Sequence, residues 1–196
     1  MRKDLITSLL AVVVMTVFLG LVYPLAITGI SQVVFPGKAN GSKVSLDGRV
    51  VGSSLIGQDF KGKPAYFQSR PSATEYSGNV TYFGNAGPNS AEARDAVREN
   101  LAAYVKREKP YDKPLTRERV PVDAVTESAS GVDPHISEAN ARIQAHRVAA
   151  VRKLSLARVE ELIADNTDDR SLGVLGEPGV NVLQLNIALE EEAPLK

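Results

Sequence analysis

The sequence feature that most constrains this chain is a run without charged residues, from residue 5 to residue 37. Its first part, LITSLLAVVVMTVFLGLVYPL over residues 5–25, is long enough as a helix to cross a bilayer core, which takes about 20 apolar residues. Arg2 and Lys3 precede it, and basic residues favour the cytoplasmic side of a membrane. The sequence therefore predicts a cytoplasmic N-terminus and an extracytoplasmic remainder.

A cleaved signal peptide is the alternative for this segment. The apolar region of a signal peptide is about 7 to 15 residues long and ends at a small-x-small cleavage site. In this chain the apolar run is longer and continues through YPLAI at residues 23–27. We therefore expect residues 1–36 to form a cytoplasmic tip and an uncleaved anchor helix, and residues 37–196 to form one extracytoplasmic domain.

Some residues inside the span favour contact with another membrane helix. Thr16 and Gly20 form a small-xxx-small pair that lets a second helix approach closely. Pro24 is expected to end or kink the helix, and Tyr23 suits the headgroup boundary. The alternative is that this pair arose by chance, since Thr and Gly are common in membrane helices.

Composition excludes several classes of function. The chain has 23 basic and 23 acidic residues, so no net positive field attracts nucleic acid. It has no cysteine, which excludes disulfides, thiolate metal sites and cysteine nucleophiles. About 160 residues follow the anchor, which is enough for a single domain with its own core.

Hydrophobic periodicity predicts an α+β domain after the anchor. Helical spacing of apolar residues is found over residues 89–109, 137–152 and 155–165. In the first of these, Asn89 is expected to cap the helix, with Glu92 three residues later. Strand-like patterns are found over residues 49–56, 65–68 and 180–191.

One phosphate-loop motif fails on its context. GQDFKGK, at residues 57–63, fits G-x-x-x-x-G-K, but Pro64 replaces the Ser or Thr that would hold a metal ion. A strand rather than a helix is expected to follow, so no helix N-terminus is available for a phosphate. We therefore do not interpret this segment as a nucleotide site.

A second polar loop, residues 121–137, has two interpretations. Its hydroxyl and carboxylate oxygens could hold a cation or a phosphate, or they could cap the backbone of the loop itself, which Ser, Thr and Asp often do. The two histidines, His135 and His146, are not spaced as a helical zinc pair. No familiar hydrolase motif is present, so an anchored hydrolase would need two acidic residues brought together by the fold.

Short motifs occur in a fixed order over nearly the whole length of the chain. They are Tyr23-Pro24-Leu25, Thr28-Gly29, Ala39-Asn40-Gly41-Ser42, Gly52-Ser53, Leu55-Ile56-Gly57-Gln58, Tyr66-Phe67, Arg70-Pro71-Ser72-Ala73, Val122-Asp123, Val125-Thr126, Ser130-Gly131, Asp133-Pro134-His135-Ile136-Ser137, Gln144, Arg147-Val148-Ala149, Gly176-Glu177-Pro178 and Val180-Asn181-Val182-Leu183. Through the order and spacing of these motifs, the chain resembles the C subunits of Kdp-type potassium-transporting ATPases.

The resemblance implies an accessory subunit in the cell membrane that is not itself an enzyme. Its implied partners are an ATP-hydrolysing P-type subunit and a channel-like potassium subunit. Its implied roles are assembly and that of a catalytic chaperone, which raises the ATP affinity of the hydrolysing subunit. It also implies no firmly bound cofactor, with ATP reached through the partner; if nucleotide does contact this chain, the candidate residues are Gln144, Ser128, Ser130 and Gly131.

The sequence departs from the family pattern at several positions. Glu127 and Ala129 stand in a stretch where the family tends to read T-A-S-G-S-G, and the added carboxylate would repel a phosphate. Gly179 stands where Arg is usual, and residues 83–88 differ from the usual Ser-Asn-Leu-Gly-Pro run. These departures weaken the expectation of a direct nucleotide contact.

The expected topology also conflicts with a direct contact, because ATP is scarce outside the cell. We therefore expect the coupling to pass through the membrane helix and the partner subunits, with the outer domain over the potassium entrance. The alternative function is a free-standing, membrane-anchored module that senses or binds a solute through the loop from Thr126 to Asp133.

Overall fold

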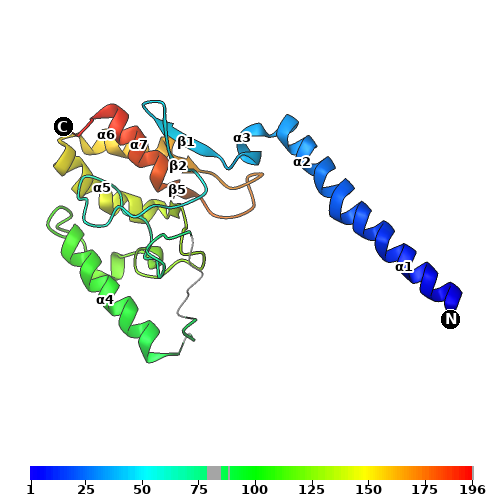
Figure 1. Cartoon of the computed structure of the whole chain (residues 1–196). Helices are drawn as coiled ribbons and strands as arrows, with labels where there is room; N and C mark the ends of the chain where they lie inside the picture. The colour runs from blue at the N-terminus through cyan, green and yellow to red at the C-terminus, as the bar shows by residue number, and fades with distance from the viewer. Residues whose placement is uncertain (79–84, 88, 196) are drawn as a thin grey trace. The chain divides into compact units, whose positions relative to one another are not determined.

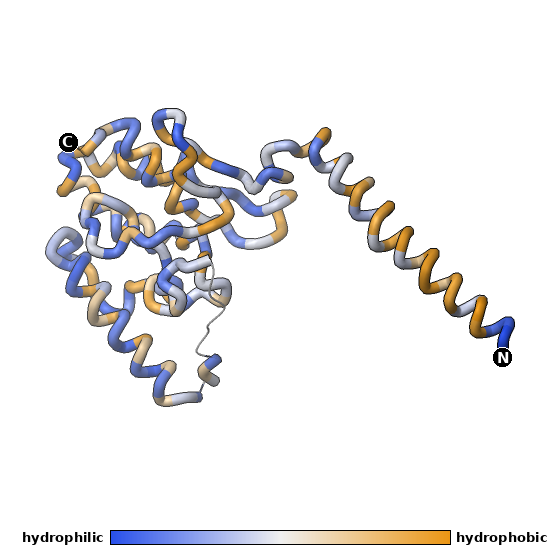
Figure 2. The backbone as a smooth tube through the Cα atoms, viewed as in Figure 1, coloured by the Kyte–Doolittle hydropathy of each residue, from blue (hydrophilic) through white to orange (hydrophobic). Residues whose placement is uncertain are grey.

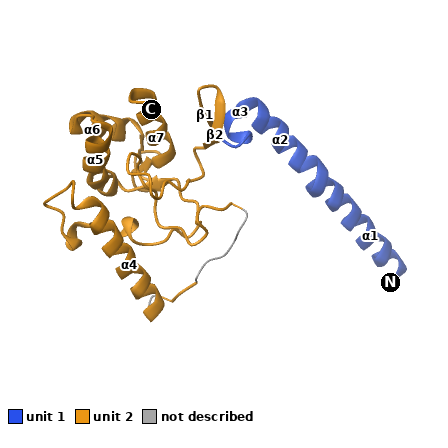
Figure 3. Ribbon diagram, turned by 60° about the vertical axis from the view of Figure 1, so that its left-hand side comes forward, with its two compact units in different colours: residues 1–43 blue, residues 44–196 orange. Residues whose placement is uncertain are grey.

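The computed structural model describes residues 1–78, 85–87 and 89–195, and these form two compact units, residues 1–43 and 44–196 (Figure 3). Unit 1 contains α1 (Arg2–Val17), a π-helical segment (Phe18–Val22), α2 (Tyr23–Val34) and the short α3 (Pro36–Ala39). Residues 2–34 form one continuous helix that is long and apolar enough to cross a membrane, and none of it is buried within the protein (Figure 2). The predicted long apolar helix is confirmed.

The helix does not end at Pro24, as the sequence allowed, but continues ten residues further, to Val34. The irregularity lies immediately before the proline, where the amide of Tyr23 donates to the carbonyl of Phe18 in a π-helical turn. Proline lacks an amide donor, and a local change of helix type is one way in which membrane helices adjust to it.

Unit 2 begins with a hairpin of β1 (Lys43–Leu46) and β2 (Arg49–Ser53). Asp47 and Gly48 connect the strands, both with positive φ (49° and 74°), as a two-residue primed turn requires. The predicted strand over residues 49–56 is therefore confirmed only as far as Ser53.

The remaining elements mix helices with one small sheet (Figure 1). The helices are α4 (Ala91–Glu108), α5 (Glu138–Arg152), α6 (Leu156–Asp165) and α7 (Val182–Glu192), with 3₁₀ turns at Arg117–Arg119 and Val122–Ala124. The sheet has the antiparallel order β3 (His135–Ile136), β5 (Gly179–Asn181), β4 (Thr167–Asp168). Ile136 and Thr167 both pair with Val180. The α+β prediction is confirmed.

Three predicted helices are present with small shifts at their ends. The helix predicted from residue 89 begins at Ala91, because Ser90 rather than Asn89 is the cap and accepts the amide of Ala93 through its hydroxyl (3.0 Å). Ser137 and Ser155 cap α5 and α6 in the same way. Helix ends commonly differ by one or two residues from a pattern-based prediction.

The strand predicted over residues 180–191 is wrong. Only residues up to Asn181 belong to β5, and the rest form α7, whose first turn is capped by the side chain of Asn181. The buried residues Val182, Leu185 and Leu189 follow helical i, i+3, i+7 spacing. The apolar positions of this segment satisfy both a period of two and a period of 3.6, so periodicity alone could not decide.

Two apolar clusters hold unit 2 together. The larger joins α5, α6 and α7 to the sheet, and its buried members include Phe67, Ile136, Val148, Val159 and Leu185. The smaller joins α4 to α5, and its buried members are Tyr104, Leu115, Ala124, Val125 and Ile143. The irregular segment after β2 thus enters the larger core through Phe67.

Candidate functional site

Buried polar side chains connect α4 with α5. The hydroxyl of Tyr104 donates to Oδ1 of Asn140 (2.8 Å), and Nε2 of Gln144 donates to the same oxygen (2.9 Å). All three residues are buried, and burial raises the pKa of Tyr104 well above its ordinary value. Because an unpaired buried polar group costs about 1–3 kcal/mol, this network fixes the pairing of the two helices.

Asp123 fixes the start of α5 within the same network. Its carboxylate accepts the amide of Ser137 (2.9 Å), the hydroxyl of Ser137 (2.7 Å) and Nδ2 of Asn140 (3.0 Å). The Ser137 hydroxyl in turn accepts the amide of Asn140 as the helix cap (3.2 Å). The loop before α5 is therefore locked to the helix by a single carboxylate.

Two side-chain amides bond to the backbone of the segment at residues 65–68, in the way that a neighbouring strand would. Gln144 accepts the amide of Gln68 through Oε1 (2.7 Å) and donates to its carbonyl through Nε2 (3.0 Å). Asn186 of α7 holds the amide and carbonyl of Phe67 in the same way, at 2.8 and 3.0 Å. The predicted strand at residues 65–68 is wrong, because within the described chain its backbone groups bond to these helices instead.

Arg147 crosses the interior from α5. Its Nε donates to both carboxylate oxygens of Glu108 (3.0 and 3.2 Å), and its Nη2 donates to Oε1 of Gln144 (3.0 Å). Its Nη1 donates to the carbonyls of Pro64 and Tyr66. Gln144 and Arg147 are both buried, so neither belongs to a solvated face of α5.

The guanidinium of Arg70 organises the loop that precedes β3. Its Nη1 lies 2.9 Å from Oδ2 of Asp133, and its Nη2 donates to the Thr126 hydroxyl and the Glu127 carbonyl (3.4 and 3.3 Å). Positions 126 and 133 of the loop, which could have faced a cation or phosphate, are thus bonded to a cation of the protein itself.

Polar side chains of the same loop also bond to the loop's own backbone. Ser130 accepts the amide of Val132 (3.2 Å), and Asp133 accepts the amide of His135 through its second oxygen (3.0 Å). The Thr126 hydroxyl donates to the carbonyl four residues before it (2.8 Å). The capping interpretation of this loop is confirmed.

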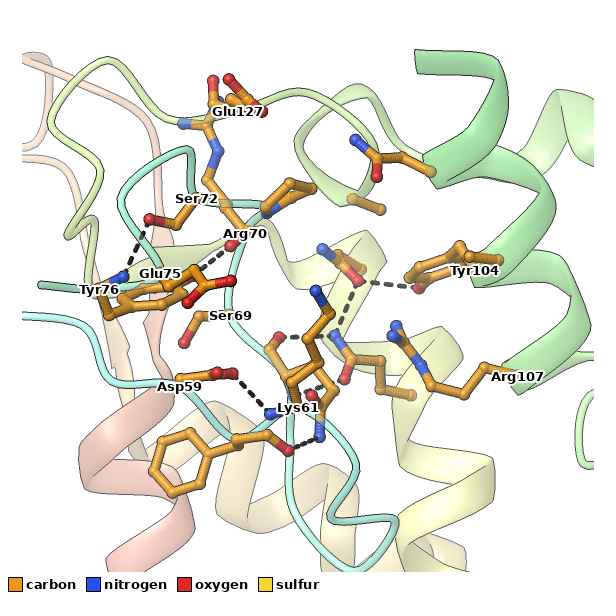
Figure 4. Close-up of a pocket in the computed structure, with 18 of the residues that line it drawn as sticks. Asp59, Lys61, Ser69, Arg70, Ser72, Glu75, Tyr76, Tyr104, Arg107 and Glu127 are labelled. Atoms are coloured by element: carbon orange, nitrogen blue, oxygen red, sulfur yellow. Dashed lines mark hydrogen bonds between the residues drawn. The ribbon is translucent and has the colours of Figure 1, made fainter. Parts of the chain in front are cut away.

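A cavity of about 370 Å³ opens above the buried network (Figure 4). Its lining includes Gln144, Asn140 and Tyr104 from the network, and charged side chains of both signs surround them. Figure 4 shows Tyr104 and Arg107 on α4, on the side opposite Glu75 and Tyr76. The charged lining residues are Asp59, Lys61, Arg70, Glu75, Arg107 and Glu127.

Two residues of the lining, Arg107 and Tyr76, are held in place by neighbouring groups. Arg107 donates to Oε1 of Glu108 (2.6 Å) and lies over the ring of Tyr104, 5.0 Å from its centroid. Tyr76 donates its hydroxyl to the carbonyl of Arg70, and burial raises the pKa of Tyr76 to about 12. The charged and polar lining suits a small polar solute better than an apolar one.

The structure separates the residues that the sequence proposed for nucleotide contact. Gln144 lines the cavity, but its amide is occupied by Gln68, Asn140 and Arg147. Ser128, Ser130 and Gly131 are described residues outside that lining. Through their backbone groups, Ser128 and Gly131 make three hydrogen bonds to the 70–74 segment.

Those three bonds explain the position of the loop. Ser128 donates its amide to the Pro71 carbonyl (3.2 Å), and the Gly131 carbonyl accepts the hydroxyls of Ser72 (2.6 Å) and Thr74 (3.3 Å). In unit 1, Thr16, Gly20 and Pro24 are all exposed.

The phosphate-loop motif at residues 57–63 is explained by packing. Gly57 is buried and donates its amide to the carbonyl of Val132 (2.8 Å), and a Cβ at this position would collide with the carbonyl oxygen of Asp133. No helix follows Lys63 in the described chain before α4. The rejection of this motif is confirmed.

The departures from the family pattern fall in different places. Glu127 lines the cavity through its side chain, whereas Gly179 lies in β5, where a Cβ would come within 3.2 Å of Cβ of His135. His135 also pairs with Asp168 across the sheet (2.8 Å between Nε2 and Oδ2). Half of the departing segment at residues 83–88, namely residues 83, 84 and 88, lies outside the described residues.

Sequence reasoning missed the members of the network that come from outside α5. Tyr104 and Glu108 lie in the helix predicted over residues 89–109, but the sequence assigned no polar role to either. One signal was available: Gln144 and Arg147 occur at i, i+3 spacing within a helix that is otherwise rich in Ala, Val and Ile. Such a pair on a buried helix needs polar partners from elsewhere in the fold.

Comparisons with known proteins agree over the full length. A family model described as KdpC, K+-transporting ATPase, c chain, matches residues 5–191. The chain is 47% identical over 197 residues to a protein of Koribacter versatilis named potassium-transporting ATPase KdpC subunit, covering 100% of this chain and 98% of that protein. It is 47% identical over 193 residues to the protein of the same name from Mycobacterium tuberculosis, covering 97% and 99%. The corresponding protein of Rhodospirillum rubrum is 45% identical over 197 residues, covering 100% and 99%.

Proposed function

The chain belongs to the KdpC family, the c chains of K+-transporting ATPases, and from this we propose that it is a non-transporting accessory subunit of an ATP-driven potassium uptake complex. In this role it assists assembly and raises the ATP affinity of the hydrolysing subunit, as a catalytic chaperone. It acts from the cell membrane, with its N-terminus in the cytoplasm and unit 2 outside.

The observation that carries the proposed indirect effect on ATP affinity is the internal hydrogen bonding of the Gln144 side chain. Both atoms of its amide are used by other residues of unit 2, so a nucleotide would have to break bonds to Gln68 or Arg147 to reach them. Breaking a buried bond of this kind costs about 1–3 kcal/mol. This supports an indirect effect on ATP affinity, transmitted through the membrane helix and the partner subunits.

The helix of unit 1 supplies the surface for that transmission. It is exposed along its whole length, and Thr16 and Gly20 permit the close approach of another helix. A Cβ at Gly20 would meet nothing within 4 Å in the isolated chain. A larger side chain there would therefore disturb contact with a partner without disturbing this chain.

The test uses the complex purified from its native membrane with mild detergent. We expect Gly20→Leu to reduce recovery of the other subunits and to raise the KM for ATP of the recovered complex. The control is Ala26→Leu, on the same helix but outside a small-xxx-small pair. Equal behaviour of the two variants would reject transmission through this helix.

Labelling the assembled complex with a photoreactive ATP analogue separates direct from indirect action. The proposal expects label on the hydrolysing subunit alone. Label on this chain that Gln144→Ala abolishes would show a direct contact and contradict the indirect effect.

A free-standing module that binds a solute is the second candidate, favoured by the cavity of about 370 Å³ and its charged lining. That function predicts that the tagged chain is recovered alone, as a stable species that binds a small polar solute. Recovery with the ATPase subunits would reject it.

A further inference from the structure

The connection between β4 and β5 exposes a group of apolar side chains. The exposed fractions are 89% for Leu172, 72% for Val174 and 59% for Leu175. We refer to residues 171–175 as the apolar tip. In Figures 1 and 2 the connection after α6 is a loop that extends away from the helices of unit 2. Neighbouring exposed apolar residues of this size mark interaction sites more often than chance.

The apolar tip is held in one conformation by its backbone. Ser171 and Leu175 exchange two hydrogen bonds of 2.9 Å each, and the amide of Gly173 donates to the carbonyl of Arg170 (2.9 Å). On either side of the apolar tip, Arg170 and Glu177 form an ion pair, with 2.6 Å between Nη2 and Oε2. A preformed loop loses little conformational freedom on binding, which favours its use as an anchor in an interface.

The turn itself does not explain why a leucine occupies position 172. Leu172 has a φ of 55°, in the left-handed region where Gly or Asn is more favourable. Its side chain is also almost fully exposed, so it gains nothing from burial in this chain. A contact outside this chain would account for a large apolar side chain at such a position.

The charge around the apolar tip points to a protein rather than a lipid surface. A cavity of about 350 Å³ adjoins it, lined in part by Ser171 and Leu175. Its lining carries five carboxylates and one guanidinium; the charged residues are Asp123, Asp133, Asp168, Asp169, Glu177 and Arg70. Arg70 pairs with Asp133 and Arg170 pairs with Glu177, so the formal net charge of the lining together with Arg170 is −3, with His135 neutral. Membrane surfaces rich in anionic lipid would repel this region, whereas a basic side chain of a partner would be attracted.

We propose that the apolar tip inserts into an apolar pocket with a basic rim on another subunit of the same potassium-transporting complex. The inference rests on the proposed function in so far as it requires that complex. The apolar side chains supply the buried centre of the contact, and the acidic cavity beside them receives a basic side chain from the rim. Such an arrangement, an apolar centre with a charged surround, is typical of binding hot spots.

Photo-crosslinking tests the position of the apolar tip directly. The variant Leu172→p-benzoylphenylalanine is made in the full chain, co-expressed with the complex and irradiated in native membranes. The matched control carries the same probe at Val122, which is 73% exposed and lies outside the apolar tip. We expect an adduct between position 172 and a subunit of the ATPase complex, identified by mass spectrometry, and a much weaker adduct from position 122.

A pair of charge substitutions tests the energetic importance of the contact. Val174→Asp and Val122→Asp alter side chains of nearly equal exposure, 72% and 73%, so neither should disturb folding of this chain. We expect Val174→Asp to reduce recovery of the other subunits about tenfold at moderate salt, with little change for Val122→Asp.

The outcomes separate the two proposals. If the wild-type chain recovers no ATPase subunit, the proposed function itself fails. If it recovers them but position 172 crosslinks only to lipid, or if Val174→Asp recovers them as well as Val122→Asp does, the apolar tip is not the contact and this inference is overturned alone.

Discussion

Nε of Arg147 lies 3.0 Å from Oε2 of Glu108, and the two side chains are 1% and 0% exposed. Burial lowers the pKa of Arg147, and the carboxylate of Glu108 opposes that effect. Glu108 is the last residue of α4 and Arg147 belongs to α5, so the pair adds a charged contact to the apolar cluster that joins the two helices. The same arginine also holds the segment around residue 65 through two carbonyls.

Glu108→Gln should destabilise the protein strongly, because it leaves a buried guanidinium without its counter-charge. We expect a loss of about 3–5 kcal/mol in the free energy of unfolding. Denaturant unfolding of the full chain in detergent, followed by circular dichroism, measures it. Glu99→Gln, exposed on the same helix, is the control and should change little. A similar small change for both would show that the pair contributes nothing.

Gln144→Ala should also destabilise the protein. It leaves the buried amide and carbonyl of Gln68 without partners, at a cost of about 1–3 kcal/mol for each group. Thermal unfolding should show the loss, whereas Arg142→Ala, one exposed position on the same helix, should leave the unfolding temperature nearly unchanged. Unaltered stability with weakened ATP binding by the complex would instead assign Gln144 to the nucleotide.

Asn181→Ala should weaken the start of α7. Its side chain caps the helix by accepting the amide of Gln184 (3.1 Å) and donates to the carbonyl of Ser54 (2.8 Å). Loss of a helix cap costs about 1 kcal/mol, and the second bond adds to this. The control Gln184→Ala keeps the cap, because the bond uses only the backbone of residue 184. Equal unfolding free energies of the two variants would contradict the prediction.

Stability should fall at alkaline pH as tyrosines ionise. Burial raises the pKa of Tyr76 from an ordinary value of about 10 to about 12. A group whose pKa is raised on folding contributes its full stability below the unfolded pKa, so this contribution is lost between about pH 10 and pH 12. Two pKa units correspond to about 2–3 kcal/mol. Burial raises the pKa of Tyr104 as well, so it acts in the same direction.

Tyr76→Phe isolates this contribution. The variant loses the bond to the Arg70 carbonyl and should be less stable at neutral pH, but its stability should decline less steeply above pH 10. Unfolding free energies measured from pH 8 to pH 12 give the two slopes. The control is Tyr111→Phe, at an exposed position. A slope for Tyr76→Phe as steep as that of the wild type would show that Tyr76 does not titrate in this way.

The helices were predictable where one periodicity clearly fitted best. The first helix follows from uncharged length, and α4, α5 and α6 follow from apolar spacing. The segment after β5 was assigned to the wrong class, because its leucines alternate as in a strand while also lying on one helical face. Only the buried neighbours of Val182, Leu185 and Leu189 distinguish the two patterns.

The candidate site was predictable in part. The loop between Thr126 and Asp133 caps its own backbone, as its composition suggested, and Gln144 lines a cavity. The hydrogen-bond partners of Gln144 could not be predicted. Gln68 lies 76 residues away in the sequence, and Tyr104, 40 residues away, is linked to Gln144 through Asn140, to which both donate. Contacts over such separations depend on how helices pack, which local pattern does not encode.

The sequence by itself determined an apolar helix long enough to cross a membrane, an α+β fold after it and membership of a family, because length, charge and ordered motifs are properties of the chain. The tertiary structure alone decided that Arg147 and Gln144 are buried and that the backbone of Phe67 and Gln68 is held by side-chain amides. The physical reason is the cost of leaving buried polar groups unpaired: each polar group inside unit 2 had to find its partner in three dimensions.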